Sequence, residues 1–156
     1  MSAIASFWLL QTNAIGGLRA AAEQGDAYAE AYHHYLRQHG REVASYRWSG
    51  YFIGTLLSYL PNKCGIKLRS SDPDLSMALT EATGSTHIIF NNAHKIANLD
   101  RLCSQQFSGR ALHNFFNEFN AAREVDVSGP MLDGIRAICE ALAAIDEETI
   151  VILRIG

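Results

Sequence analysis

The sequence has few cysteines, little excess charge and no long hydrophobic run. Its three cysteines, Cys64, Cys103 and Cys139, lie far apart in the 156-residue chain, a spacing that favours neither a disulfide framework nor a zinc-binding pair. We therefore expect a reduced, cytoplasmic setting. The formal net charge of -3 argues against a nucleic-acid-binding protein that works by neutralising phosphates, although it leaves room for a basic protein partner.

Membrane segments are also missing. The most apolar window, residues 50–60, is about half the roughly 20 residues that a membrane-spanning helix needs. No basic segment precedes the N-terminal apolar residues, so we expect neither a signal peptide nor membrane association. The length and the apolar content of 48% predict one globular domain, residues 1–156, with a single core.

Common catalytic and cofactor-binding motifs do not occur in the sequence. It has no Gly-rich phosphate loop, no His-Glu-x-x-His, no Gly-x-Ser-x-Gly and no calcium loop. Cys103 and His113 could form a nucleophile and base if the fold joined them, but Cys103 falls in an apolar stripe, where a thiol is buried and inert. The sequence therefore favours a protein without enzymatic activity, cofactor or metal.

The last apolar run, residues 149–155, predicts a strand in the middle of a sheet. It is apolar on both faces of a two-residue period, which is typical of a strand covered on both sides. A similar run at residues 3–10 predicts a strand at the other end of the chain, and we expect the two to share one sheet. Residues 86–90 predict another strand, and residues 65–68 are a short candidate.

Helical spacing of apolar residues, with caps and breakers at the ends, predicts helices between these strands. The segment from about 43 to 59 is apolar almost all round, so we expect it at the centre of the molecule. The result is an α+β fold: a mostly helical single domain with a small sheet that includes the N-terminal and C-terminal strands. The predicted helices cover roughly residues 14–24, 27–39, 43–59, 73–83, 92–103, 109–119 and 129–145.

Six histidines invite a metal or ligand hypothesis. His33 and His34 would point about 100° apart on a helix, and His39 is five residues beyond His34, so we expect solvated helix residues rather than metal ligands.

A polar group near residue 90 is the better candidate for a ligand site. It consists of His87, Asn91, Asn92 and His94. An asparagine at a helix start is more simply explained as an N-cap.

Acidic residues cluster outside the predicted core. Helix caps and the helix dipole account for two of them, Asp72 and Asp74. With a partner present, such carboxylates would block a basic active site and speed its capture. The candidate partner-binding residues are Asp72, Asp74, Glu81, Glu124 and Asp126.

Several segments together point to a known family. They are Met1–Phe7 followed by a helix, Trp48 in its apolar helix, Asp72–Leu79, and the final helix and strand from Leu132 to Ile155. This pattern resembles the YfbM-like family of small bacterial proteins, although Thr86–Phe90 stands where the family has a Gly-Tyr-Gly-Pro-like stretch. The resemblance implies an α+β fold and a role in neutralising a toxin.

We therefore expect a non-enzymatic protein-binding module, an immunity protein that occludes a cognate toxin. The alternative is a small intracellular enzyme or ligand-binding protein that uses the His87, Asn91, Asn92 and His94 region. The sequence does not predict the oligomeric state.

Overall fold

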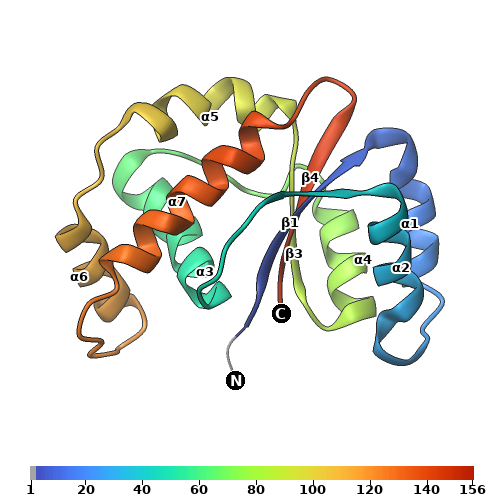
Figure 1. Cartoon of the computed structure of the whole chain (residues 1–156), viewed down its shortest axis with the longest axis horizontal. Helices are drawn as coiled ribbons and strands as arrows, with labels where there is room; N and C mark the ends of the chain where they lie inside the picture. The colour runs from blue at the N-terminus through green and yellow to red at the C-terminus, as the bar shows by residue number, and fades with distance from the viewer. Residues whose placement is uncertain (1–2) are drawn as a thin grey trace.

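The computed structural model describes residues 3–156, in which helices cover both faces of a four-stranded antiparallel sheet (Figure 1). Met1 and Ser2, which open the first segment of the family resemblance, lie outside the described residues. The strand order is β2-β1-β4-β3. The strands are β1 (Ala5–Gln11), β2 (Arg41–Ala44), β3 (Thr86–Phe90) and β4 (Thr149–Ile155). The predicted α+β fold, with the first and last strands in one sheet, is confirmed.

Strand β4 lies in the middle of the sheet. It pairs with β1 along its whole length and with β3 from Val151 to Ile155. Because successive side chains of a strand point to opposite faces, Val151 and Leu153 enter one core and Ile150 and Ile152 enter the other. All four are buried, which explains why the run is apolar on both faces.

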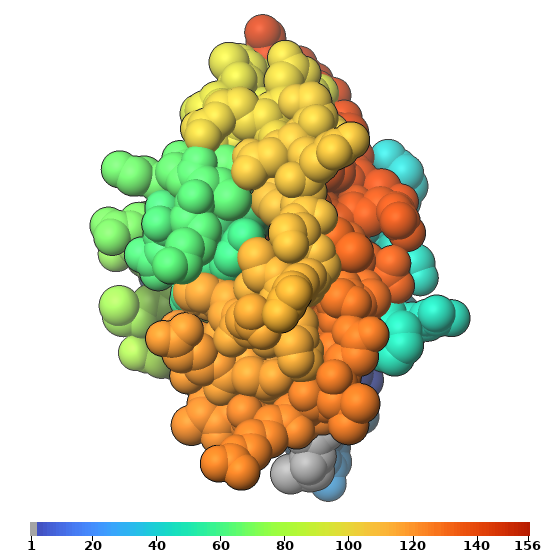
Figure 2. Space-filling view, turned by 90° about the vertical axis from the view of Figure 1, so that its left-hand side faces the viewer, coloured from blue at the N-terminus to red at the C-terminus, as the bar shows by residue number. Residues whose placement is uncertain are grey.

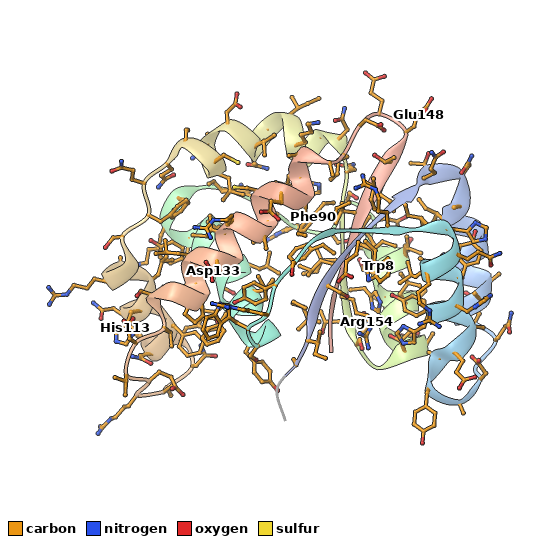
Figure 3. The ribbon with its side chains drawn as sticks, viewed as in Figure 1. Trp8, Phe90, His113, Asp133, Glu148 and Arg154 are labelled. Carbon is orange, nitrogen blue, oxygen red and sulfur yellow. The ribbon has the colours of Figure 1, made fainter. Side chains whose placement is uncertain are left out.

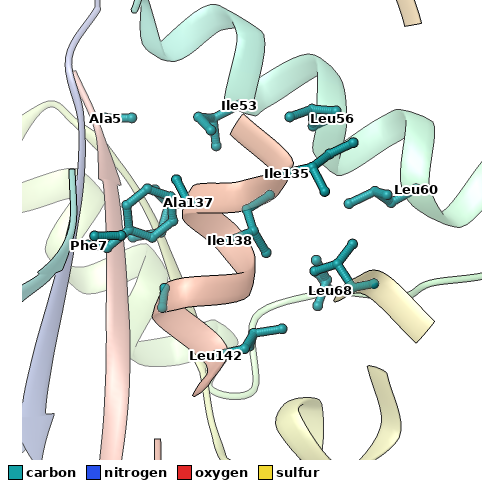
Figure 4. Packing of buried hydrophobic residues seen from close by; sticks show 14 of the residues in the cluster. Ala5, Phe7, Ile53, Leu56, Leu60, Leu68, Ile135, Ala137, Ile138 and Leu142 are labelled. Carbon is teal, nitrogen blue, oxygen red and sulfur yellow. The ribbon is translucent and has the colours of Figure 1, made fainter. Parts of the chain in front are cut away.

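The larger core lies between the sheet and helices α3 (Gly50–Tyr59), α5 (Asn92–Ser104), α6 (Gly109–Phe119) and α7 (Ser128–Ala143). In Figure 4, α7 lies between the strands and α3, and the Phe7 side chain of β1 points towards α7, which carries Ala137 and Ile138 of the same core. On the outer face, the chain through α5 and α6 runs between α3 and α7 (Figure 2).

The smaller core lies on the other face, under α1 (Ile15–Ala22), α2 (Glu30–His39) and α4 (Pro73–Thr83). Short helical turns occur at Thr12–Ala14, Ala27–Ala29 and Leu60–Cys64. The buried side chains of the smaller core include Leu10, Leu18, Tyr32, Leu36, Leu75, Leu79, Ile89, Ile150 and Ile152.

Two local predictions are wrong. The helix expected over residues 43–59 begins only at Gly50, where Ser49 caps it by accepting the Tyr51 N–H at 3.3 Å. Val43 and Ala44 instead end β2, because pairing with β1 overrides a weak local helical pattern, and residues 45–49 link β2 to the helix. Residues 65–68 form no strand, although Ile66 and Leu68 are buried in the larger core.

Candidate functional site

The four residues of the predicted ligand site divide between the two ends of β3. His87, near its start, lies two residues before Ile89, so both side chains are on the same face of β3 and point to the smaller core. Asn91, Asn92 and His94 follow its last residue. At roughly 3.3 Å per strand residue, the four steps from His87 to Asn91 span about 13 Å. The structure therefore does not gather these residues into one site.

Asn91 and His94 close the N-terminus of α5. The Asn91 side-chain oxygen accepts the His94 N–H at 3.2 Å, and His94 Nδ1 accepts the Asn91 N–H at 3.1 Å. With Nδ1 accepting, His94 Nε2 carries the proton and donates to the Arg69 carbonyl at 2.6 Å. Burial lowers the pKa of His94, and the bond to Arg69 partly opposes this shift. The cap interpretation accounts for both residues.

A hollow of about 350 Å³ at this end of the sheet is lined by Asn91 and Asn92 together with Asp72. The Asp72 carboxylate accepts the Leu75 N–H at 3.0 Å and caps α4, as the sequence predicts. Asp146, on the rim of the same hollow, accepts hydrogen bonds within its own turn, and these bonds lower its pKa. Both carboxylates are therefore engaged in local structure.

The five acidic residues predicted to bind a partner fall on opposite faces of the sheet. Asp72, Asp74 and Glu81 belong to α4 and its cap, whereas Glu124 and Asp126 lie between α6 and α7. Helix α4 packs on the smaller core, and α6 and α7 pack on the larger one (Figure 1). Asp126 accepts two local hydrogen bonds, which lower its pKa. The five residues therefore do not form one contact surface.

His87 takes part in a hydrogen-bonded chain at the smaller core. Its Nδ1–H donates to the Ser85 carbonyl at 2.8 Å, which leaves Nε2 to accept from the Tyr32 hydroxyl at 2.6 Å. Tyr32 is 0% exposed and His87 is 3% exposed. Burial disfavours charge, so it raises the pKa of Tyr32 and lowers the pKa of His87 to about 4. Both side chains are therefore uncharged at neutral pH.

Arg154 lies beside this pair, opposite His87 in the pairing of β3 with β4. Figure 3 shows Arg154 and Trp8 on the side of the sheet that faces α2. Burial is the main cause of the lowered pKa of His87 and of His33 on α2, and the charge of Arg154 lowers both pKa values further. We call Tyr32, His33, His87 and Arg154 the Arg154 cluster.

Of the Arg154 cluster, only His87 belongs to a site that the sequence predicts. His33, expected to be a solvated helix residue, is half-buried, and its ring lies 5.0 Å from the ring of Tyr32. The signal in the sequence is Arg154 itself. It follows Ile150 and Ile152 at a spacing of two, so a strand assignment already places its charge on a covered face.

A second polar surface forms where the link after β2 meets α7. Trp48 is 36% exposed, and its indole N–H donates to Asp133 at 2.9 Å. Arg136 pairs with the other oxygen of Asp133 at 3.1 Å, and the Arg47 guanidinium lies 4.9 Å from the centre of the Trp48 ring. Figure 3 shows Asp133 on α7. These contacts hold Trp48 in one orientation, outside the helix in which the sequence placed it.

Two adjoining hollows lie at this surface, and Trp48 lines the first of them. Their volumes are about 430 and 420 Å³, and Ser45, Tyr46 and Glu140 line both. Glu140 and Glu42 are exposed, and neither takes part in an ion pair within residues 3–156. We call this surface the Trp48 groove, lined by Glu42, Ser45, Tyr46, Arg47, Trp48, Asp133, Arg136 and Glu140.

Cys103 is exposed, so the expectation of a buried thiol is wrong. It lies beside Cys139 of α7 rather than beside a catalytic base. Burial and the neighbouring Cys103 raise the pKa of the Cys139 thiol to about 12. His113 is engaged elsewhere: it accepts the Val127 N–H at 3.4 Å.

Within residues 3–156, no three His, Cys, Asp or Glu side chains converge in a way that could hold a metal ion. In the same part of the chain, no helix has the length and apolar character to cross a membrane. Comparison with protein-family models, with curated proteins and with solved structures finds no match.

Proposed function

We propose that this chain is a bacterial protein-binding module, an immunity protein that occludes a cognate toxin through the Trp48 groove. The proposal rests on one observation: Trp48 is exposed yet fixed by Asp133 and Arg47 beside an open groove. The resemblance to the YfbM-like family supports the same role.

The side chains of the groove suit a protein interface. Residues that dominate binding energy at interfaces are enriched in tryptophan, tyrosine and arginine, and the groove offers Trp48, Tyr46, Arg47 and Arg136. The Tyr46 hydroxyl donates to the Pro130 carbonyl at 2.9 Å, so this ring is also held in place. Side chains that are ordered before binding lose less conformational entropy when a partner docks.

Charge supports a basic occupant. Glu42 and Glu140 are exposed at the groove and free of ion pairs within the described residues, whereas Asp133 already balances Arg136. Arg47 is exposed and also unpaired in the same residues, so three carboxylates and two guanidiniums leave the groove with a formal charge of -1. Two such carboxylates can meet the cationic groups of a basic toxin site and speed its capture at low salt. The groove thus takes over the role that the sequence assigned to the acidic residues of α4 and of the loop between α6 and α7.

The test is co-expression of this chain with the product of the adjacent gene. We expect the neighbour to arrest growth alone, and this chain to restore growth and to form a stable complex with it. Trp48→Ala should weaken the complex by at least about 2 kcal/mol, roughly thirtyfold, as truncation of a central tryptophan typically does, and should reduce the protection accordingly.

Met77→Ala is the matched control, since Met77 is 61% exposed on α4 and far from the groove on the opposite face. It should protect as well as the unaltered chain does. A harmless neighbour would contradict the toxin assignment, and full protection by Trp48→Ala would contradict the groove.

A further inference from the structure

A hollow of about 550 Å³ lies between the end of α3 and β3, the outermost strand on that side of the sheet. Leu57, Pro61 and Ile88 line it with half-buried apolar side chains. Lys67 and Arg69 line it too, and both are exposed and free of ion pairs within residues 3–156. None of its lining residues is acidic. We call this hollow, with its apolar wall and its two cations, the Lys67 hollow.

The surface around the Lys67 hollow is basic, although the whole chain has a formal net charge of -3. Between Glu42 and Asp72 the sequence has no acidic residue, and this stretch includes Lys63, Lys67 and Arg69. Asp72 itself lines a different hollow, where it caps α4. The Lys67 hollow therefore favours an occupant that carries carboxylates and an apolar group.

The backbone above the hollow also offers hydrogen-bond donors. The carbonyls of Lys67 and Arg69 accept hydrogen bonds from two side chains of α5, at 3.2 and 2.6 Å. In a trans peptide the N–H points opposite to the carbonyl, so the N–H groups of Leu68 and Ser70 point away from α5. Both residues line the hollow, and no residue of α5 does. Neither N–H donates to another backbone carbonyl within residues 3–156, so both are available to an occupant.

The loop between α6 and α7 has the complementary chemistry. Glu124, Val125 and Asp126 are all exposed, and Val125 is 96% exposed, the largest fraction for any large hydrophobic side chain in residues 3–156. Asp126 uses one carboxylate oxygen to accept from Ser128, which leaves the other oxygen for a partner. Arg123 precedes the three residues, so two carboxylates and one guanidinium give the loop a formal charge of -1.

The loop is fixed away from the Lys67 hollow of its own chain. The Asn117 side chain on α6 accepts the Glu124 N–H at 3.0 Å and donates to the Glu124 carbonyl at 3.3 Å. Figure 1 shows the link between α6 and α7 at the lower end of the helical layer, whereas residues 67–70 contact α5 at its upper end. The loop of one copy can therefore fill only the hollow of another.

We propose that the Lys67 hollow binds residues 124–126 of a second copy of this chain. Val125 packs against the apolar wall, so that its side chain leaves water, and the carboxylates on either side pair with the two cations of the hollow. The Val125 carbonyl, which accepts no backbone hydrogen bond within residues 3–156, accepts one from the N–H groups that face the hollow. Each copy carries one loop and one hollow, so a two-fold dimer makes the contact twice.

The test is self-association of the full chain, followed by sedimentation velocity and by amide NMR at increasing protein concentration. We expect reversible association, with concentration-dependent shifts of the Leu68, Ser70 and Val125 N–H groups. The contact is small, so the association should be weak. A chain that stays monomeric up to about 1 mM would overturn the proposal.

Charge reversals at exposed positions test the pairing of loop and hollow. Lys67→Glu combined with Arg69→Glu, and Glu124→Lys in a separate chain, should each weaken self-association by at least about tenfold, because like charges then face each other. A mixture of the two variants should associate at least about tenfold more tightly than either alone, since the mixed dimer keeps one unaltered loop in one unaltered hollow. A mixture as weak as the single variants would overturn the proposal.

Lys63→Glu is the matched control. Lys63 is exposed in the same acid-free stretch but does not line the hollow, so its reversal should leave self-association unchanged. A loss as large as that of the hollow variant would mean that only the overall charge of this surface matters, and would overturn the proposal. Trp48→Ala should also associate normally, because Trp48 is not part of the hollow, so this contact is tested independently of toxin binding.

Discussion

The two faces of the sheet differ in what they bury. The larger core is built mainly from apolar side chains of four helices, and its buried polar side chains, Thr55 and Asn98, donate to backbone carbonyls and carry no charge. The smaller core instead encloses Tyr32 and His87 and ends at Arg154, although it is formed by the same central strand. On the face of β4 that meets the larger core, Val151 is followed by Leu153. On the other face, Ile152 is followed by the charged side chain of Arg154.

The two cores therefore differ in how much free energy their buried side chains contribute to folding. An apolar core gains free energy from every buried methylene, whereas a buried polar group at best recovers the hydrogen bonds that it made in water. The smaller core therefore gives up part of its stabilisation to hold a neutral tyrosine–histidine pair next to an unpaired cation.

The largest expected effect comes from placing a charge where the two cores share β4. Ile152→Asp should unfold the protein, because an unpaired buried charge costs several kcal/mol against a total stability of about 5–15 kcal/mol. Circular dichroism and thermal melting measure this directly. Ile96→Asp, at a side chain 79% exposed on α5, is the control and should leave the melting temperature nearly unchanged. A folded Ile152→Asp variant would disprove the central position of β4.

The second largest effect is expected from acid, which should lower the free energy of unfolding through the smaller core. Unfolded histidine binds a proton near pH 6.5, but folded His87 does so only near pH 4, so the unfolded state binds more protons between these values. The free energy of unfolding should therefore fall by up to about 3 kcal/mol as the pH drops from 6.5 to 4. Urea denaturation over this range measures the slope.

His33 and His94 also have lowered pKa values and contribute to the slope in the same direction. The contribution of His87 is the difference between the unaltered chain and His87→Asn, whose slope should be shallower. His34→Asn changes an exposed histidine on α2 and serves as the comparison. Equal slopes for all three proteins would mean that protonation of His87 does not cause the loss of stability in acid.

The smallest effect tests the cost of the unpaired cation. Arg154→Met keeps a long apolar stem but removes the buried donor, and should raise the free energy of unfolding by about 1 kcal/mol. Arg37→Met, at an exposed position, should change stability by no more than about 0.5 kcal/mol. A marked loss of stability in Arg154→Met would show that the guanidinium has a structural role within the protein.

Local sequence signals predict much of the fold. The run from Thr149 to Ile155 is a central strand because its apolar residues occupy both faces, and Asp72 caps α4 where the sequence places it. Strand β2 could not be found this way. Its four residues show no alternation, and only their pairing with β1, more than 30 positions earlier in the chain, makes them extended.

The sequence predicts the candidate sites less well than it predicts the fold. His87 and His94 are seven positions apart, but the strand between them separates their environments and gives His87 neighbours from α2 and β4. Residue spacing carries no information about such long-range contacts. Trp48 illustrates the same limit, because its apolar neighbours suggested a helix, whereas its partner Asp133 lies 85 positions later.

The distinction between the two faces is tested most directly by the ionisation of His87. Proton–nitrogen NMR of the histidine rings across a pH titration should show His87 neutral, with its proton on Nδ1, until the pH approaches about 4. Tyr32→Phe should move that pKa, because it removes the hydroxyl bonded to Nε2. Titration of His87 near pH 6.5, or a proton resting on Nε2, would contradict the hydrogen-bonded chain on which this view of the smaller core depends.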